Sequence, residues 1–100
     1  MPAFRDERWL CKVLSYLPHE PCGVTLRLLA EDILGSDKPT ATVHIRAAIL
    51  AMPEVLGIRT CKQRVSPSSL AEEYWIAPAD AAEARKLAAI VVDAELAREQ

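Results

Sequence analysis

The sequence predicts a small α+β fold in which helices form the body and a β-hairpin projects from it. Apolar residues recur at three- and four-residue steps in four segments, whereas residues 56–76 are rich in β-branched and aromatic residues. With 100 residues and 51% apolar content, the chain fits one domain with an aliphatic core. We expect a single domain over residues 1–100, with core and hairpin in 1–77 and an added C-terminal helix in 78–100.

The first two helices are predicted from periodicity and from their end signals. Between Arg5 and Leu17 one helical face is apolar, and two prolines follow it. That face consists of Trp9, Leu10, Val13, Leu14 and Leu17. The second helix begins after Thr25, whose hydroxyl suits an N-cap, and ends at Gly35, because a chain reversal with positive φ favours glycine. Its inward residues are expected to be Leu26, Leu29, Ala30 and Ile33.

A third helix follows a short polar link, Ser36–Pro39. It opens at Pro39 or Thr40, and we expect Pro53 with Gly57 to close it. Its apolar positions are Val43, Ile45, Ala48, Ile49 and Met52. The order helix, short link, helix is therefore predicted between Thr25 and Pro53.

The hairpin is predicted from residue type and from turn-forming residues. Leu56–Val65 combines β-branched residues with polar alternation, which favours a strand. Ser66–Ser69 forms the turn, Leu70–Glu73 is either a helical turn or a loop, and Tyr74–Ile76 is the return strand.

The last helix is predicted over Ala79–Arg98, a stretch rich in alanine and free of glycine and proline. Asp80 with Glu83 three residues later resembles a capping box. An apolar stripe follows at alternating three- and four-residue steps, at Ala84, Leu87, Val91 and Ala94. Two interpretations of this stripe stand: it completes the core of the monomer, or it pairs with its copy in a homodimer.

Two short motifs resemble the winged helix-turn-helix output domains of bacterial response regulators. They are Thr42-Val43-His44-Ile45-Arg46 and, after a gap, Gly57-Ile58-Arg59-Thr60. The resemblance covers roughly residues 22–77 and implies that the third helix is a recognition helix and the hairpin a wing. The chain departs from the family where Ala47–Leu50 replace a stretch rich in Arg and Lys, and where the Gly-Tyr ending of the wing is absent.

The resemblance and residue chemistry together nominate contacts to double-stranded DNA on the third helix. In this interpretation its N-terminal half presents hydroxyl, imidazole and guanidinium groups to a major groove, at Thr40, Thr42, His44 and Arg46. In the alternative interpretation the same face is simply solvated.

Basic charge is concentrated where such a surface requires it. The chain as a whole carries a net charge of −2, which argues against indiscriminate coating of nucleic acid. Residues 36–66, however, hold five cations and two acids, a balance of +3. Three of these cations, Arg59, Lys62 and Arg64, fall on the first wing strand and would hold phosphates. In the alternative interpretation these three cations simply make a charged edge strand that discourages aggregation.

Other kinds of site have little support in the sequence. Three cysteines, an odd number without the spacing of a disulfide framework, indicate a reducing, cytoplasmic environment. His19 and Cys22 form the one close pair of metal-binding type, so no metal site is expected. We likewise expect no cofactor, no catalytic centre and no membrane segment.

The leading hypothesis from the sequence is a small transcriptional or phage-type regulator that binds duplex DNA, as a dimer. The competing hypothesis is a winged-helix-like inhibitor or adaptor that binds a protein and not DNA. It draws on the near-neutral charge and on the apolar patch of Ala47, Ala48 and Leu50.

Overall fold

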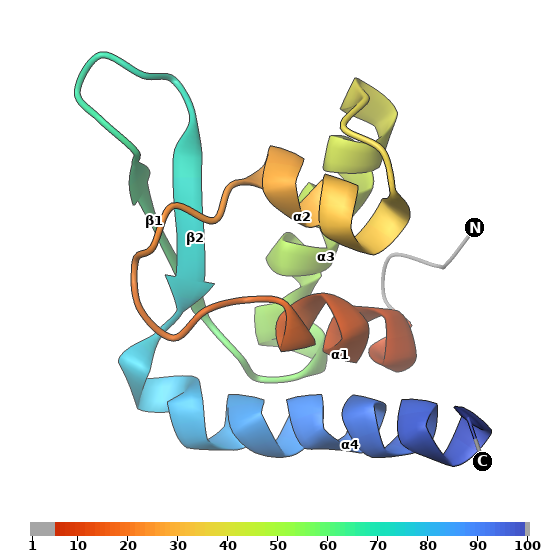
Figure 1. The fold of residues 1–100 in the computed structure, drawn as a ribbon. Coiled ribbons are helices and arrows are strands. Elements are labelled where there is room, and N and C mark those ends of the chain that lie inside the picture. The colour runs from red at the N-terminus through yellow and green to blue at the C-terminus, as the bar shows by residue number, and fades with distance from the viewer. Residues whose placement is uncertain (1–5, 100) are drawn as a thin grey trace.

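The computed structural model describes the backbone of residues 6–99 and the side chains of residues 6–91. Its elements in chain order are α1 (Glu7–Ser15), α2 (Leu26–Leu34), α3 (Pro39–Val55), β1 (Thr60–Arg64), β2 (Glu72–Ile76), the 3₁₀ turn η1 (Pro78–Asp80) and α4 (Ala81–Glu99). Within the described residues the fold is therefore α+β, with four helices and a two-stranded antiparallel sheet (Figure 1). This layout is compatible with a winged-helix arrangement.

The first two helices confirm the predicted apolar faces, and α2 also confirms its predicted ends. Helix α1 is shorter than predicted, because it begins after Asp6 and ends at Ser15, two residues before Leu17. The Asp6 carboxylate accepts hydrogen bonds from the backbone N–H groups of Arg8 and Trp9, and all five residues of the predicted α1 face are buried. At α2, the Thr25 hydroxyl accepts from the N–H of Leu28 at 3.3 Å, and Gly35 ends the helix with φ 69°. Local side-chain chemistry is thus sufficient to define these boundaries.

Helix α3 differs from the prediction in two respects. Pro53 does not end it, because a proline in the last turn removes one N–H donor while its fixed φ remains helical, and α3 continues to Val55. Gly57, with φ 72°, then reverses the chain. Val43, predicted to be an inward residue, is instead 52% exposed, whereas Ile45, Ala48, Ile49 and Met52 are buried as expected.

The hairpin is present, but its two strands are more equal in length than predicted. Residues 56–59 are not strand, because Leu56 caps α3 and the buried Ile58 donates its N–H to the Met52 carbonyl at 3.4 Å. The return strand β2 begins at Glu72, inside the segment expected to be a turn or loop. Its register pairs Thr60 with Ile76 and Arg64 with Glu72.

The outer edge of β2 is covered by the segment that joins α1 to α2. The N–H of Tyr74 donates to the Val24 carbonyl at 2.8 Å, and the N–H of Ile76 donates to the Pro18 carbonyl at 2.9 Å. A bridge between Thr25 and Glu73 continues this pairing. The hairpin is therefore fastened to the helical body along one of its two edges.

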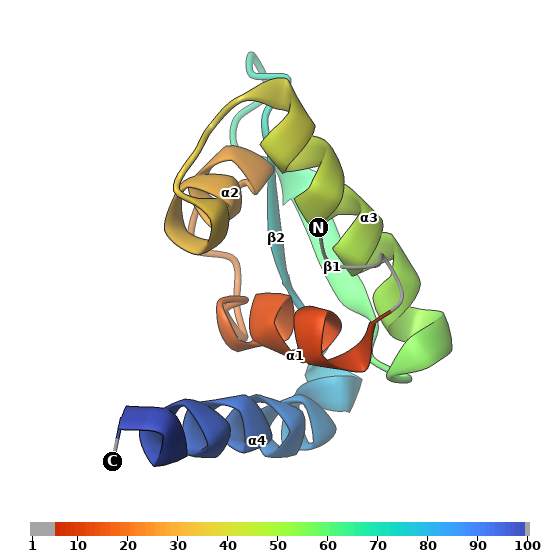
Figure 2. The ribbon, with the colours of Figure 1, turned by 90° about the vertical axis from the view of Figure 1, so that its right-hand side faces the viewer.

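Helix α4 packs across α1 at the end of the molecule opposite the hairpin loop (Figures 1 and 2). Ala84 is fully buried in the core and Leu87 packs against that core, so these two residues complete the core of the monomer, as in the first of the two interpretations. Pairing of the stripe in a homodimer stays a prediction. Val91 is half-buried, and Ala94 lies outside the described side chains.

The predicted capping box at the start of α4 is also wrong. The 3₁₀ turn η1 occupies this position, and the Asp80 carboxylate accepts hydrogen bonds from the backbone and side chain of Arg59 instead of capping α4. Among the described residues, no helix has the length and apolar content needed to cross a membrane.

Candidate functional site

The four α3 residues nominated for DNA contact are not equally accessible. Thr40 and Arg46 are exposed, whereas Thr42 and His44 are half-buried. The Thr42 hydroxyl donates to the Pro39 carbonyl at 2.8 Å, which uses its proton within the helix. Of the four, Thr40 and Arg46 are thus best able to meet a ligand.

The outward face of α3 is apolar over much of its length. Val43 and Leu50 are 52% and 72% exposed, and one full heptad separates them, so they lie on the same side of the helix. Val43 was predicted to face the core. The signal that could have identified this second stripe is the seven-residue spacing of Val43 and Leu50, out of phase with the buried set at Ile45, Ala48 and Met52.

The three wing cations have different surroundings. The Arg59 guanidinium forms an ion pair with Asp80 at 3.1 Å, and Lys62 lies 3.9 Å from Glu72 across the strand pair. Arg64 is exposed and forms no ion pair with the side chains described for residues 6–91. Arg64 is therefore the most available of the three, and Arg59 the least.

The Arg59 to Asp80 contact ties the start of β1 to the turn before α4. The hydrogen bonds from the Arg59 side chain and backbone lower the pKa of the Asp80 carboxyl below its ordinary value. The same pair raises the pKa of the guanidinium, chiefly through the hydrogen bond to Asp80. The predicted phosphate contact of Arg59 would have to compete with this internal partner.

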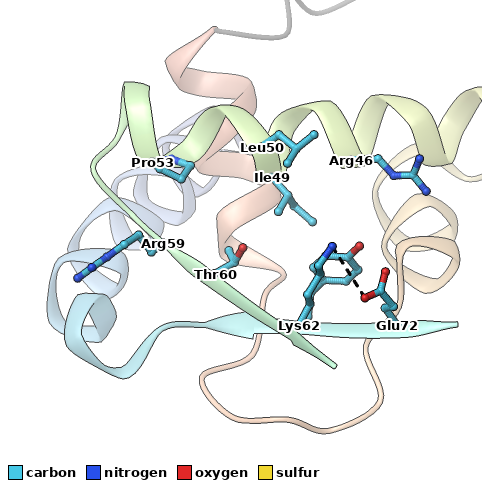
Figure 3. A pocket seen from close by; sticks show the side chains of 9 residues that line it. Arg46, Ile49, Leu50, Pro53, Arg59, Thr60, Lys62 and Glu72 are labelled. Carbon is cyan, nitrogen blue, oxygen red and sulfur yellow. Dashed lines mark ion pairs between the residues drawn. The ribbon is translucent and has the colours of Figure 1, made fainter. Parts of the chain in front are cut away.

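A half-open groove of about 590 Å³ lies between the C-terminal half of α3 and the hairpin (Figure 3). Its apolar part comprises Ile49, Leu50, Pro53 and the ring of Tyr74. Arg46, Lys62 and Glu72 stand at one end, whereas the Arg59 side chain extends away from the other (Figure 3). The groove thus has three of the predicted cations in its lining, Arg46, Lys62 and Arg59, although the Arg59 side chain points away from its apolar floor.

Tyr74 links this groove to the core. Its side chain is buried, and burial followed by the nearby Glu72 charge raises the pKa of the phenol, whereas Arg46 acts in the opposite direction. At neutral pH the phenol is therefore uncharged, and it supplies an apolar ring with one hydroxyl to the groove.

Glu73, on the opposite face of β2, is the one charged residue among the buried side chains described, at 8% exposure. One carboxylate oxygen accepts from the Gly23 N–H, and the other accepts from the Gln63 amide at 2.6 Å. Both oxygens are thus hydrogen-bonded, which offsets the desolvation of the charge. Glu73 was not nominated from the sequence, and its role is to join the two strands to the covering segment.

The cysteines do not assemble into a site within the described residues. Cys11 is buried in α1, and burial, with a smaller contribution from Glu7, raises the pKa of its thiol. Cys22 is exposed and Cys61 is half-buried, and all three thiols are free. No group of three or more His, Cys, Asp or Glu side chains in this part of the chain is arranged to hold a metal ion.

No family model matches the chain, and no match was found among curated proteins or among solved structures.

Proposed function

We propose that this protein is a winged-helix transcriptional regulator that binds duplex DNA through the N-terminal half of α3 and the wing formed by β1, β2 and their loop. The relative position of α3 and the hairpin supports this proposal. The first turn of α3 and the hairpin loop lie at the same end of the molecule, opposite α4 (Figures 1 and 2). A recognition helix with an adjacent wing requires this arrangement.

The charges on this side of the molecule support the proposal. Lys38 and Arg46 on the α3 side and Arg64 on the wing are exposed and form no ion pair with the side chains described. Asp37, the acid nearest the start of α3 in sequence, is already paired with Arg27 at 3.1 Å. Three available cations can therefore approach phosphates without first giving up a partner.

Within this interface the residues have separate roles. Arg46, on the helix, would read a base edge, and one bidentate contact of this kind discriminates by roughly 1–3 kcal/mol. Arg64 would hold a phosphate, which contributes affinity without sequence information. Thr40 would contribute a hydroxyl at the start of the helix, where backbone N–H groups also favour a phosphate.

Titration of labelled duplexes selected from a randomised pool tests this function. Binding should weaken between about 50 and 200 mM salt. Arg46→Ala should weaken binding to a selected duplex by about tenfold or more. Arg64→Ala should reduce the salt slope by about 1. Arg85→Ala, an exposed arginine on α4, is the matched control and should bind as the unaltered protein does. Failure to enrich any duplex at the lower salt concentration would sink the proposal.

A second function, binding of a protein partner, is favoured by the exposed Val43 and Leu50. Exposed side chains of this size are enriched at protein interfaces when they gather in one patch. The open edge of β1, which lies beside Leu50, indicates which kind of protein segment could bind there.

A further inference from the structure

The two edges of the hairpin are used differently. The outer edge of β2 is occupied, because its N–H groups at Tyr74 and Ile76 donate to the covering segment. The sheet contains β1 and β2 alone, so the outer edge of β1 has no neighbouring strand among the described residues.

The pairing of the strands shows which backbone groups of β1 point outward. The N–H of Ala77 donates to the Arg59 carbonyl at 2.9 Å, and the N–H of Val65 donates to the Ala71 carbonyl at 3.0 Å. In an antiparallel ladder, residues that face the partner strand alternate with residues that do not. Thr60, Lys62 and Arg64 therefore direct their N–H and C=O groups away from β2.

The apolar groove lies beside this open edge. Thr60 and Lys62 line it from β1, and Leu50 and Pro53 line it from α3 (Figure 3). The α3 stretch from Arg46 to Pro53 is about 10 Å long, or two helical turns. A strand added to β1 would direct every second side chain into this groove.

The charges of the groove select the kind of segment that would fit. Its lining contains three cations, Arg46, Arg59 and Lys62, and one carboxylate, Glu72. Arg59 is already paired with Asp80, and Lys62 is paired with Glu72 at the long distance of 3.9 Å. The unsatisfied positive charge thus lies at the Arg46 end, and the apolar contacts lie toward Pro53.

We propose that β1 and this groove form a docking site for an extended segment of a partner protein that carries apolar and acidic residues. The segment adds a third strand to the sheet by hydrogen bonding to the outward groups of Thr60, Lys62 and Arg64. An apolar side chain opposite Thr60 contacts Leu50 and Pro53. An acidic side chain two residues away lies opposite Lys62, near Arg46, where a cross-strand pair of opposite charge is favourable.

A peptide fits both the open backbone edge of β1 and the exposed apolar side chain of Leu50 better than DNA does. The outward N–H and C=O groups match the repeat of an extended polypeptide, and the 72% exposed Leu50 gains from apolar contact. The site goes beyond the proposed DNA interface, although Arg46 and Arg64 belong to both and the sequence also nominated Lys62 for phosphate contact. Variants that test the docking site are therefore chosen at Leu50 and Thr60, which the DNA proposal does not use.

Selection of a displayed library of random peptides on the full chain tests this inference. Enriched peptides should carry an apolar residue two positions from Asp or Glu. Leu50→Asp should weaken binding of an enriched peptide by about tenfold or more, since it replaces an apolar contact of the groove with a charged side chain. Thr60→Pro, at the first residue of an edge strand, removes one outward N–H and should also weaken it. Ile90→Asp, a matched change of a 62% exposed residue on α4, should leave binding unchanged.

Amide hydrogen exchange separates strand addition from other kinds of contact. The bound peptide should protect the amides of Thr60, Lys62 and Arg64. Three results would each overturn the inference: unprotected amides, enrichment of peptides without this pattern, or full binding by Leu50→Asp. If Thr60→Pro does not fold, the Leu50→Asp variant still provides the test. Protection of the same three amides by duplex DNA, without peptide enrichment, would assign the groove to nucleic acid. If no duplex binds but peptides with the expected pattern are enriched, the proposed DNA-binding function is refuted and the docking site is supported.

Discussion

The outer edges of β2 and β1 belong to the same two-stranded sheet, but only the β2 edge is hydrogen-bonded to the rest of the protein. The β2 edge is joined to the body by backbone hydrogen bonds to Pro18 and Val24 and by the buried Glu73 carboxylate. The β1 edge bears Lys62 and Arg64 and borders an apolar groove. We infer that the first edge stabilises the fold, whereas the second is available for binding. Charged residues on an open edge also limit uncontrolled strand pairing, so binding requires a complementary segment.

The largest difference in stability between the two edges should come from proline substitutions at adjacent positions of β1. Gln63→Pro removes an N–H that points toward β2, together with the side-chain hydrogen bond to Glu73. We expect it to reduce the free energy of unfolding by about 3 kcal/mol. Arg64→Pro removes an outward N–H and should cost markedly less. Urea unfolding monitored by circular dichroism measures both values, and equal losses would contradict the assignment of inward and outward groups.

Removal of a carboxylate from each face of β2 should have the next largest effect. Glu73→Ala leaves the Gly23 N–H and the Gln63 amide without their acceptor, and we expect a loss of roughly 1.5–3 kcal/mol. Glu72→Ala, the matched control, removes only the long contact to Lys62 and should change the free energy of unfolding by less than about 1 kcal/mol. Chemical unfolding of both variants checks this, and a loss at Glu72 as large as that at Glu73 would contradict it.

The smallest effect is expected at the start of β1, where Asp80 holds Arg59. Because the folded-state pKa of Asp80 is lowered, the contact contributes its full stability above the unfolded value of 3.8 and loses it as pH falls through the folded pKa. Asp80→Asn should therefore be less stable than the unaltered protein at about pH 6, and this difference should narrow toward about pH 2. Asp32→Asn, at an exposed acid on α2, is the control. A difference that does not change with pH would show that the charge of Asp80 is unimportant.

The helices could be predicted from the sequence because their signals are local. The predicted buried residues of α1 and the caps of α2 at Thr25 and Gly35 depend on spacing and on groups within one turn. Four of those predicted residues, Trp9, Leu10, Val13 and Leu14, lie within α1. Pro53 was misjudged because the cost of a proline depends on its distance from the helix end, which neighbouring contacts determine. Asp80 was misjudged because the sequence does not show that Arg59 lies close enough to compete for its carboxylate.

The candidate site could be predicted only in part. Its basic residues Arg46, Arg59 and Lys62 were nominated from the sequence, and the structure brings them to one groove. The burial of Tyr74 and the pairing of Arg59 with Asp80 were not predicted, because each depends on residues distant in the chain. Of the apolar patch predicted at Ala47, Ala48 and Leu50, Leu50 is exposed, whereas Ala47 is half-buried and Ala48 is buried in the core.

The sequence by itself determined the order of helices and strands, the ends of α2, and the local excess of basic charge. Periodicity, capping and composition act over a few residues, so they can be read without coordinates. Only the tertiary structure decided which edge of the hairpin is closed, which face of α3 remains exposed, and that Ala84 packs inward against the body. Those outcomes depend on which of several distant segments forms a given hydrogen bond or covers a given apolar surface. Local sequence patterns do not specify this.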